Sequence, residues 1–158
     1  MAQDLMNRHF VAEISRVAAV YGTGHILSGK MDTARDNGEL VEVKDYIEGE
    51  YYEVGPFSGT LNAKVIEIVY KSNQTMVRFE LQEDCDAYFV HNPETMPNDF
   101  LKIYQEAYNY FNAEGERARM YPMVKHDVFT VSVDAFGGVV PTVGQSVTWT
   151  DGVGYTAA

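Results

Sequence analysis

The amino-acid sequence predicts an α+β domain that is mainly antiparallel β, a small barrel or sandwich, with a helix near 98–113 and an N-terminal helix. Short runs of alternating apolar and polar residues, separated by glycine-bearing turns, predict the strands. Two segments with apolar residues at helical spacing predict the helices. With 158 residues the chain fits one domain. We divide it into an N-terminal helix or arm with a loop, 1–36, and a β-rich domain, 37–158, into which the second helix is inserted.

Residues 4–21 have the spacing of an amphipathic helix, with apolar side chains on one face. These are Met6, Phe10, Ile14, Val17, Ala18 and Tyr21. Most such faces pack on a core, which is the commoner role for this segment. The alternative is an arm that lies on a neighbouring subunit, and in that case Phe10 and Ile14 contact the partner.

The second predicted helix starts after Pro97, where Asn98 or Asp99 can cap its first free amides. Gly115 suits the left-handed residue just beyond a helix end. The apolar residues along its predicted face are Phe100, Ile103, Tyr104, Ala107, Tyr108 and Phe111.

Runs with a period of two predict the strands of the sheet. They are 40–43, 51–54, 65–70, 76–81, 87–90, 128–133 and 147–150, with a further run at 153–156. The sequences VIEIVY and MVRFEL form the clearest pair, because the four residues KSNQ between them have the length of a hairpin turn. The dipeptide Tyr121-Pro122 cannot continue a helix.

The formal net charge of −11 excludes several classes of partner. It disfavours wrapping of nucleic acid, which requires clustered Lys and Arg, and binding to anionic membranes. The longest apolar run near the N-terminus, 17–21, is too short to span a bilayer. Cys85 is the single cysteine, so no intrachain disulfide is expected. We expect a soluble protein made in a reducing cytoplasm.

Residues 24–31 reproduce the G-x-x-x-x-G-K pattern of a phosphate-binding loop. Met31 stands where that loop needs a hydroxyl for Mg²⁺, and the following residues look like a loop, not a helix. The pattern therefore indicates a glycine-containing connection. No cofactor is expected.

The remaining candidates for chemistry are weak. The four histidines are His9, His25, His91 and His126, and they lack the close pairing of zinc ligands. Asp84 and Asp86 flank Cys85 and disfavour its thiolate. No serine-nucleophile motif occurs, and a catalytic carboxylate pair has no recognisable spacing in a sequence. We expect neither a metal nor an enzymatic activity.

An excess of tyrosine is typical of protein interfaces, although burial is the commoner role of any single tyrosine. The candidate partner contacts on this ground are Tyr51, Tyr52 and Tyr110. Arg117 and Arg119 are candidates too, because cations are few in this chain. Their alternative role is structural, as partners of nearby glutamates or of turn carbonyls.

Three segments carry a resemblance to a known family. They are NGELVEV at 37–43, FNAEGERARMYPMVKHDVFTVSVDAFGG at 111–138 and VGQSVTW at 143–149. The last two resemble the C-terminal half of small decoration or auxiliary head proteins of tailed phages, and the first resembles their opening strand. The similarity is spread over roughly 37–150.

This resemblance implies a virion structural protein made in a bacterial host. Its expected role is that of a decoration, or cement, protein that binds the outer surface of the major capsid protein lattice and stabilises the head. Further copies of the same chain are a second candidate partner. The alternatives are a head–tail connector or tail-tube subunit, and a cytoplasmic ligand-binding or enzymatic domain, which a deep polar pocket would favour.

Overall fold

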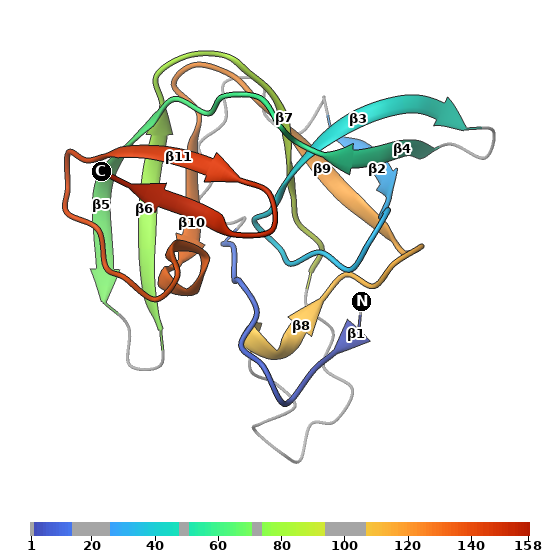
Figure 1. The fold of residues 1–158 in the computed structure, drawn as a ribbon, viewed down its shortest axis with the longest axis horizontal. Coiled ribbons are helices and arrows are strands. Elements are labelled where there is room, and N and C mark those ends of the chain that lie inside the picture. Colours follow the sequence, from blue (N-terminus) through green and yellow to red (C-terminus); the bar gives the residue numbers. More distant parts are fainter. Residues whose placement is uncertain (1, 14–25, 48–50, 71–73, 94–106) are drawn as a thin grey trace.

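The computed structural model describes residues 2–13, 26–47, 51–70, 74–93 and 107–158. Strands (β) and short 3-10 helices (η) are named in Figure 1. They are β1 (Ala2–Gln3), β2 (Leu27–Lys30), β3 (Leu40–Ile47), β4 (Tyr51–Pro56), β5 (Ala63–Tyr70), β6 (Thr75–Leu81), β7 (Cys85–Val90), η3 (Ala107–Asn109), β8 (Tyr110–Phe111), β9 (Arg117–Met123), β10 (Val128–Ser132), η4 (Val133–Phe136), β11 (Ser146–Thr150) and β12 (Gly154–Ala157).

The strands form two bodies that lie side by side (Figure 1). On the right, β2, β4, β3, β7 and β9 close into a barrel in that order, with β2 and β4 parallel and all other neighbours antiparallel. On the left, β10, β6, β5, β11 and β12 form an open antiparallel sheet. The short ribbon of β1 and β8 lies below the barrel in this view.

The barrel strands show the period of two that closure requires. On β9, Ala118 and Met120 are buried inside the barrel, whereas Arg117 and Arg119 are exposed on its outer side. The barrel interior is therefore filled by side chains and is not a channel.

Aromatic side chains join the sheet to the barrel. The ring centroid of Phe129 on β10 lies 4.6 Å from that of Phe89 on β7 and 6.2 Å from that of Phe79 on β6. Phe79 is 5.2 Å from Tyr155 on β12, and the Tyr155 hydroxyl donates to the carbonyl of Gly38 at 2.6 Å. Rings at these separations attract one another beyond their burial alone. One core therefore spans both bodies, and a second, smaller cluster fills the barrel.

Three asparagines fasten the loops next to the barrel. The side-chain amide of Asn37 donates to the carbonyl of Asn92 at 2.9 Å, and the backbone N–H of Asn92 donates back to Asn37 Oδ1 at 3.0 Å. Asn112 Nδ2 also donates to Asn37 Oδ1, at 3.1 Å, and Asn112 Oδ1 accepts from Asn92 Nδ2 at 3.2 Å. Buried amides are stable only when paired in this way. This cluster fixes the segments before β3, after β7 and after β8.

The predicted N-terminal helix is absent from residues 4–13, and residues 14–21 lie outside the described residues. Residues 2–13, which we call the strap, are extended and pair with β8 and β10. Of the two described residues of the predicted apolar face, Met6 is 90% exposed and Phe10 packs, partly buried, against the core. Pairing with two strands satisfies the backbone here in place of helical hydrogen bonds.

The predicted helix at 98–113 is also absent where the chain is described, from residue 107 onward; residues 98–106 lie outside the described residues. Residues 107–111 form η3 and β8, in which Tyr110 is buried and Phe111 stacks on His9 with centroids 5.0 Å apart. Tertiary pairing outweighs the local spacing. The predicted α+β class is therefore wrong: the described chain is mainly antiparallel β and has no α-helix, hence none of the length and apolar character that crossing a membrane requires.

Candidate partner-binding surfaces

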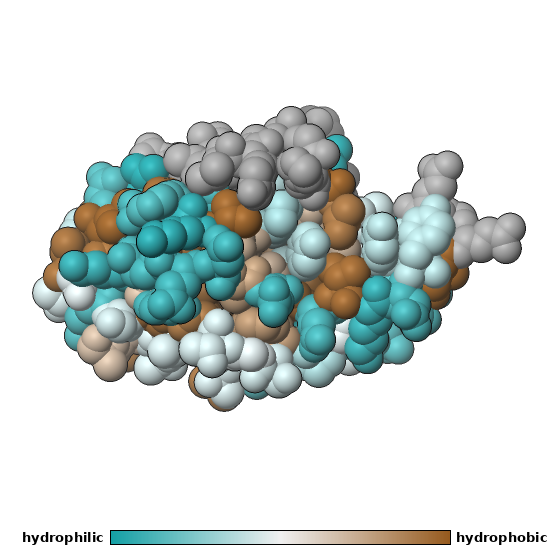
Figure 2. All heavy atoms as spheres, turned by 90° about the horizontal axis from the view of Figure 1, so that it is seen from above, coloured by the Kyte–Doolittle hydropathy of each residue, from teal (hydrophilic) through white to brown (hydrophobic). Residues whose placement is uncertain are grey.

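The open sheet exposes a cluster of apolar side chains, which we call the apolar face. Its members are Ile66, Tyr70, Val139, Val140, Val143 and Val153. Tyr70 and Val139 are the most exposed of them, at 74% and 70%. Figure 2 shows hydrophobic areas among hydrophilic ones at the sheet end of the molecule, on the left. Single exposed apolar residues are ordinary on a monomer, but a cluster marks an interaction site.

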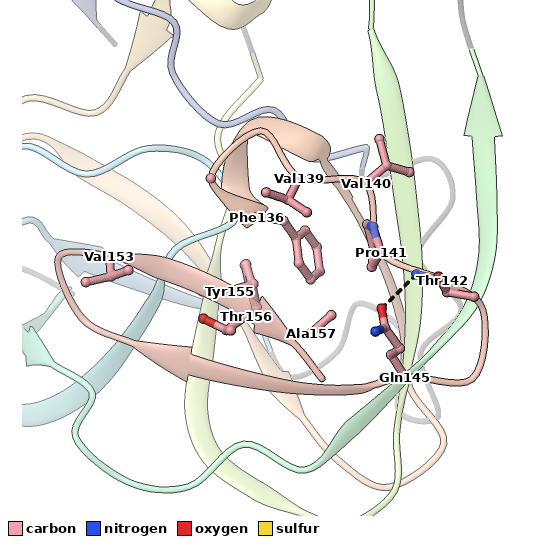
Figure 3. A pocket seen from close by; sticks show the side chains of 11 residues that line it. Phe136, Val139, Val140, Pro141, Thr142, Gln145, Val153, Tyr155, Thr156 and Ala157 are labelled. Carbon is pink, nitrogen blue, oxygen red and sulfur yellow. Dashed lines mark hydrogen bonds between the residues drawn. The ribbon is translucent and has the colours of Figure 1, made fainter.

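Two grooves run along the apolar face. The first has a volume of about 330 Å³ and lies between β12 and the loop after η4 (Figure 3). In it Phe136 and Tyr155 stack with centroids 5.6 Å apart, and at one end the Thr142 N–H donates to Gln145 Oε1 at 2.7 Å. The second groove, of about 540 Å³, follows β5 and shares Pro141 and Thr142 with the first. The two grooves therefore adjoin the same loop.

The first groove has the chemistry of a binding surface. Among the described residues that line it there is no carboxylate, imidazole, thiol, amine or guanidinium. It can remove an apolar side chain from water, which is favourable in proportion to the area buried. It offers no group to activate a nucleophile or to transfer a proton at neutral pH.

The groove also borders an edge strand. Ser146 and Ala158 exchange both backbone hydrogen bonds, at 2.9 and 3.0 Å. Hydrogen-bonded pairs alternate along an antiparallel ladder, so the N–H and C=O groups of Tyr155 and Ala157 point away from β11. No described strand pairs with that side of β12. An extended segment in the groove can therefore hydrogen-bond to β12 as an added strand.

A second surface lies on the outside of the barrel, and we call it the arginine–tyrosine face. It consists of Lys30 on β2, Tyr51 on β4, and Arg117 and Arg119 on β9. The Arg117 guanidinium carbon is 4.6 Å from the Tyr51 ring centroid, and Lys30 Nζ is 6.0 Å from it. No described carboxylate forms an ion pair with these three cations. Unpaired cations beside an aromatic ring suit an acidic partner surface.

The arginine–tyrosine face holds three of the seven residues that the sequence indicated as partner contacts. The others lie elsewhere. Tyr52 packs against the barrel interior and Phe10 packs, partly buried, against the main core. Tyr110 is 1% exposed, which leaves it no surface for a partner. Ile14 lies outside the described residues.

A polar cleft of about 430 Å³ lies beside the strap, with His9 in its wall. His9 Nδ1 is 2.5 Å from Asp36 Oδ1, and Nε2 is 3.1 Å from Asp4 Oδ2. The hydrogen bond to Asp36 is the main cause that raises the pKa of His9, and Asp4 adds to it. With both ring nitrogens engaged, His9 has none free to take a proton from a substrate. We call Asp4, His9 and Asp36 the latch, because they hold the strap.

Arg35 lies next to the latch and is 4% exposed. Its guanidinium is 2.7 Å from Asp32, 3.0 Å from Asp151 in the β11–β12 turn and 3.5 Å from Glu39. Burial raises the pKa of Glu39 to about 7, and the charges of Asp36 and Asp151 act in the same direction. A raised carboxyl pKa in a cleft is a feature of many catalytic sites. Here the Glu39 carboxylate accepts a hydrogen bond from the backbone N–H of Asp36. It therefore stabilises the turn that positions Asp36, a member of the latch.

The other candidates for chemistry are dispersed over the molecule. His126 is exposed in the turn after β9, and His25 lies outside the described residues. Gly29 and Lys30 of the phosphate-loop pattern belong to strand β2. Burial raises the pKa of the Cys85 thiol and lowers the pKa of His91, whose ring nitrogen Nε2 is 3.2 Å from the carbonyl oxygen of Ala12. Among the described residues, no three or more His, Cys, Asp or Glu side chains group as they would around a metal ion.

The apolar face is not among the features predicted from the sequence. Most of its valines lie in the stretch GGVVPTVG. Three valines within a glycine- and proline-bearing loop were the available signal, since a loop normally carries polar residues. Comparisons of the chain with family models, with curated proteins and with solved structures gave no match.

Proposed function

We propose that this protein is a non-enzymatic structural component of a tailed-phage particle, a decoration protein that binds the outer surface of the major capsid protein lattice. The apolar face carries the proposal, because it is a large exposed apolar cluster with a groove beside an edge strand. The resemblance of residues 37–150 to phage decoration and auxiliary head proteins supplies the identity of the partner.

Binding energy alone is the mechanism. A segment of the capsid protein fills the groove and pairs with β12, while the arginine–tyrosine face meets acidic side chains at a second point. A ligand that binds only the assembled lattice stabilises it by mass action. The net charge of −11 suits the solvent side of the shell, because the inner side faces DNA phosphates.

Co-sedimentation of the protein with undecorated phage heads tests this proposal. The wild type is expected to bind saturably with a copy number that matches the capsid symmetry. A variant with Val139→Asp and Val143→Asp is expected to bind at least about a hundredfold more weakly, because it places unpaired charges in a dry interface. Tyr46→Asp is the matched control: it changes an exposed apolar residue of the barrel in the same way and leaves binding intact.

Equal binding by the wild type and the double variant would exclude the apolar face as the contact. Absence of binding to heads, together with rings or tubes formed by the protein alone, would replace decoration by the head–tail connector or tail-tube function. Absence of both would leave a cytoplasmic ligand-binding or enzymatic domain, with the cleft at His9 as its site.

A further inference from the structure

The strap closes one edge of the open sheet. The Ser132 N–H donates to the carbonyl of Val11 at 2.7 Å, and the Glu13 N–H donates to the carbonyl of Thr130 at 3.1 Å. The Val11 N–H donates in turn to Ser132 Oγ at 3.0 Å. Residues 11–13 thus act as an added antiparallel strand on β10, whose other side is paired with β6.

Further contacts hold the strap across the molecule. The latch ties it to Asp36, which also accepts the Phe10 N–H at 3.0 Å. The backbone N–H groups of Asp4 and His9 each donate, at 2.7 Å, to backbone carbonyls of η3. The binding site for the strap is therefore made of η3, β8, Asp36 and β10, which all follow it in the chain. Any copy of the body carries this whole site.

The strap is the N-terminal end of the described chain, and residues 14–25 alone link it to β2. Twelve residues can reach up to ~40 Å, which exceeds the size of a sheet of this kind. In the single chain Met6 and Leu5 of the strap remain exposed, at 90% and 41%. These two residues are left in water, whereas Phe10 and Val11 of the strap pack on the body. A second body brought close can cover Leu5 and Met6.

We propose that the strap is exchangeable, and that the β10 edge and Asp36 of one copy take residues 2–13 of a second copy of this chain. The exchanged strap makes the same contacts as the strap of the single chain, so protein concentration decides between the two forms. This inference stands on the strap contacts and is independent of the proposed capsid binding.

A cross-strand disulfide reports which copy the strap occupies. Ala12 and Val131 are a non-hydrogen-bonded antiparallel pair, the arrangement with the closest Cα atoms. The experiment uses Ala12→Cys with Val131→Cys in the full chain with Cys85→Ser. The protein is equilibrated at micromolar and at near-millimolar concentration, oxidised, and run on a denaturing gel without reductant. Covalent monomers are expected at the low concentration and covalent dimers at the high one.

Val147→Cys with Ala157→Cys, in the same Cys85→Ser background, is the matched control. This pair is also a valine opposite an alanine at a non-hydrogen-bonded position, but β11 and β12 are joined by a turn of only three residues and pair within one hairpin. It should give covalent monomers at every concentration. Covalent monomers alone from the strap pair at the high concentration would overturn the proposal.

If the strap variant does not fold, sedimentation velocity of the wild type tests strap exchange through the oligomeric state of the protein. A concentration-dependent dimer that persists with Val139→Asp and Val143→Asp supports exchange, since those changes remove the apolar face as the contact. A monomer at all concentrations overturns it, and so does a dimer that the two changes abolish.

Discussion

The barrel and the open sheet deal with exposed strand edges in different ways. Closure gives each of the five barrel strands two neighbours, so the barrel has no edge. The sheet has two edges: residues 11–13 of the strap cover β10, and the apolar groove borders β12. An uncovered edge is a template for pairing with another chain. The sheet therefore holds the positions at which a second chain can add.

The side chains exposed on the barrel also differ from those exposed on the sheet. The outside of the barrel carries charged residues together with Tyr46 and Tyr51, whereas the sheet end carries the apolar face. A charged face is stable in water, but a cluster of exposed apolar residues gains free energy when a partner covers it. In the proposed binding to a partner, the sheet would supply the binding energy and the barrel at most orientation and attraction at longer range.

The largest effect of a substitution on the free energy of unfolding is expected where the sheet meets η4. A Cβ on Gly154 would lie 2.6 Å from the backbone oxygen of Ala135, and Gly154 has φ +113°, which side chains rarely adopt. Gly154→Ala should lower the free energy of unfolding by about 3–4 kcal/mol, from backbone strain and overpacking together. Urea denaturation measures this loss.

Gly29→Ala is the matching change in the barrel. The Cβ there meets the flexible end of Met120, at 2.5 Å from its sulfur, and Gly29 has an ordinary backbone angle. The expected loss is about 1–2 kcal/mol, from overpacking alone. A larger loss at Gly29 than at Gly154 would show that the closed barrel, and not the sheet, is the less adaptable body.

The second largest effect on stability is expected from Glu39, which lies between the two bodies. The pKa of Glu39 is about 7 in the fold against an ordinary value of 4.5, so folding disfavours its ionised form. Below pH 4.5 the carboxyl is neutral in both states and costs nothing. The penalty grows between pH 4.5 and 7 and is complete above 7. Glu39→Gln should therefore raise the free energy of unfolding by up to about 3 kcal/mol above pH 7.

Thermal unfolding from pH 4 to pH 9 measures this difference between Glu39→Gln and the wild type. Glu42→Gln, three residues further on and exposed on β3, is the control for the loss of one carboxylate as such. A Glu39→Gln protein that is less stable than the wild type at pH 9 would mean that the contact of Glu39 with Arg35 outweighs its burial.

Local pattern predicted much of the sheet, because alternation of side chains is written in the sequence itself. The runs at 65–70 and 76–81 lie within the paired strands β5 and β6. The sequence did not predict β9, within which Pro122 stands. In the fold β2 pairs with β9 only at residues 117–120, so at Pro122 one side of β9 has no partner that needs its N–H.

The helices and the apolar face needed information that the sequence does not carry locally. Residues 107–111 have helical spacing, but β1 and His9, about a hundred residues away, determine their structure. Tyr51 and Arg117 were both selected from the sequence as partner contacts, although nothing in their spacing of 66 positions indicated that they touch. The apolar face gathers residues from β5, a loop and a turn, and only the folded chain brings them together.

The smallest effect is expected on the arginine–tyrosine face. Arg117 is exposed and its contact with the Tyr51 ring lies in solvent, so Arg117→Ala should lower the free energy of unfolding by no more than about 1 kcal/mol. A double-mutant cycle with Tyr51→Leu isolates the contact itself, for which we expect about 0.5 kcal/mol. A coupling energy of about 2 kcal/mol or more would make the pair a stabilising element of the barrel. A small coupling energy means that both side chains can contact a partner with little loss of stability.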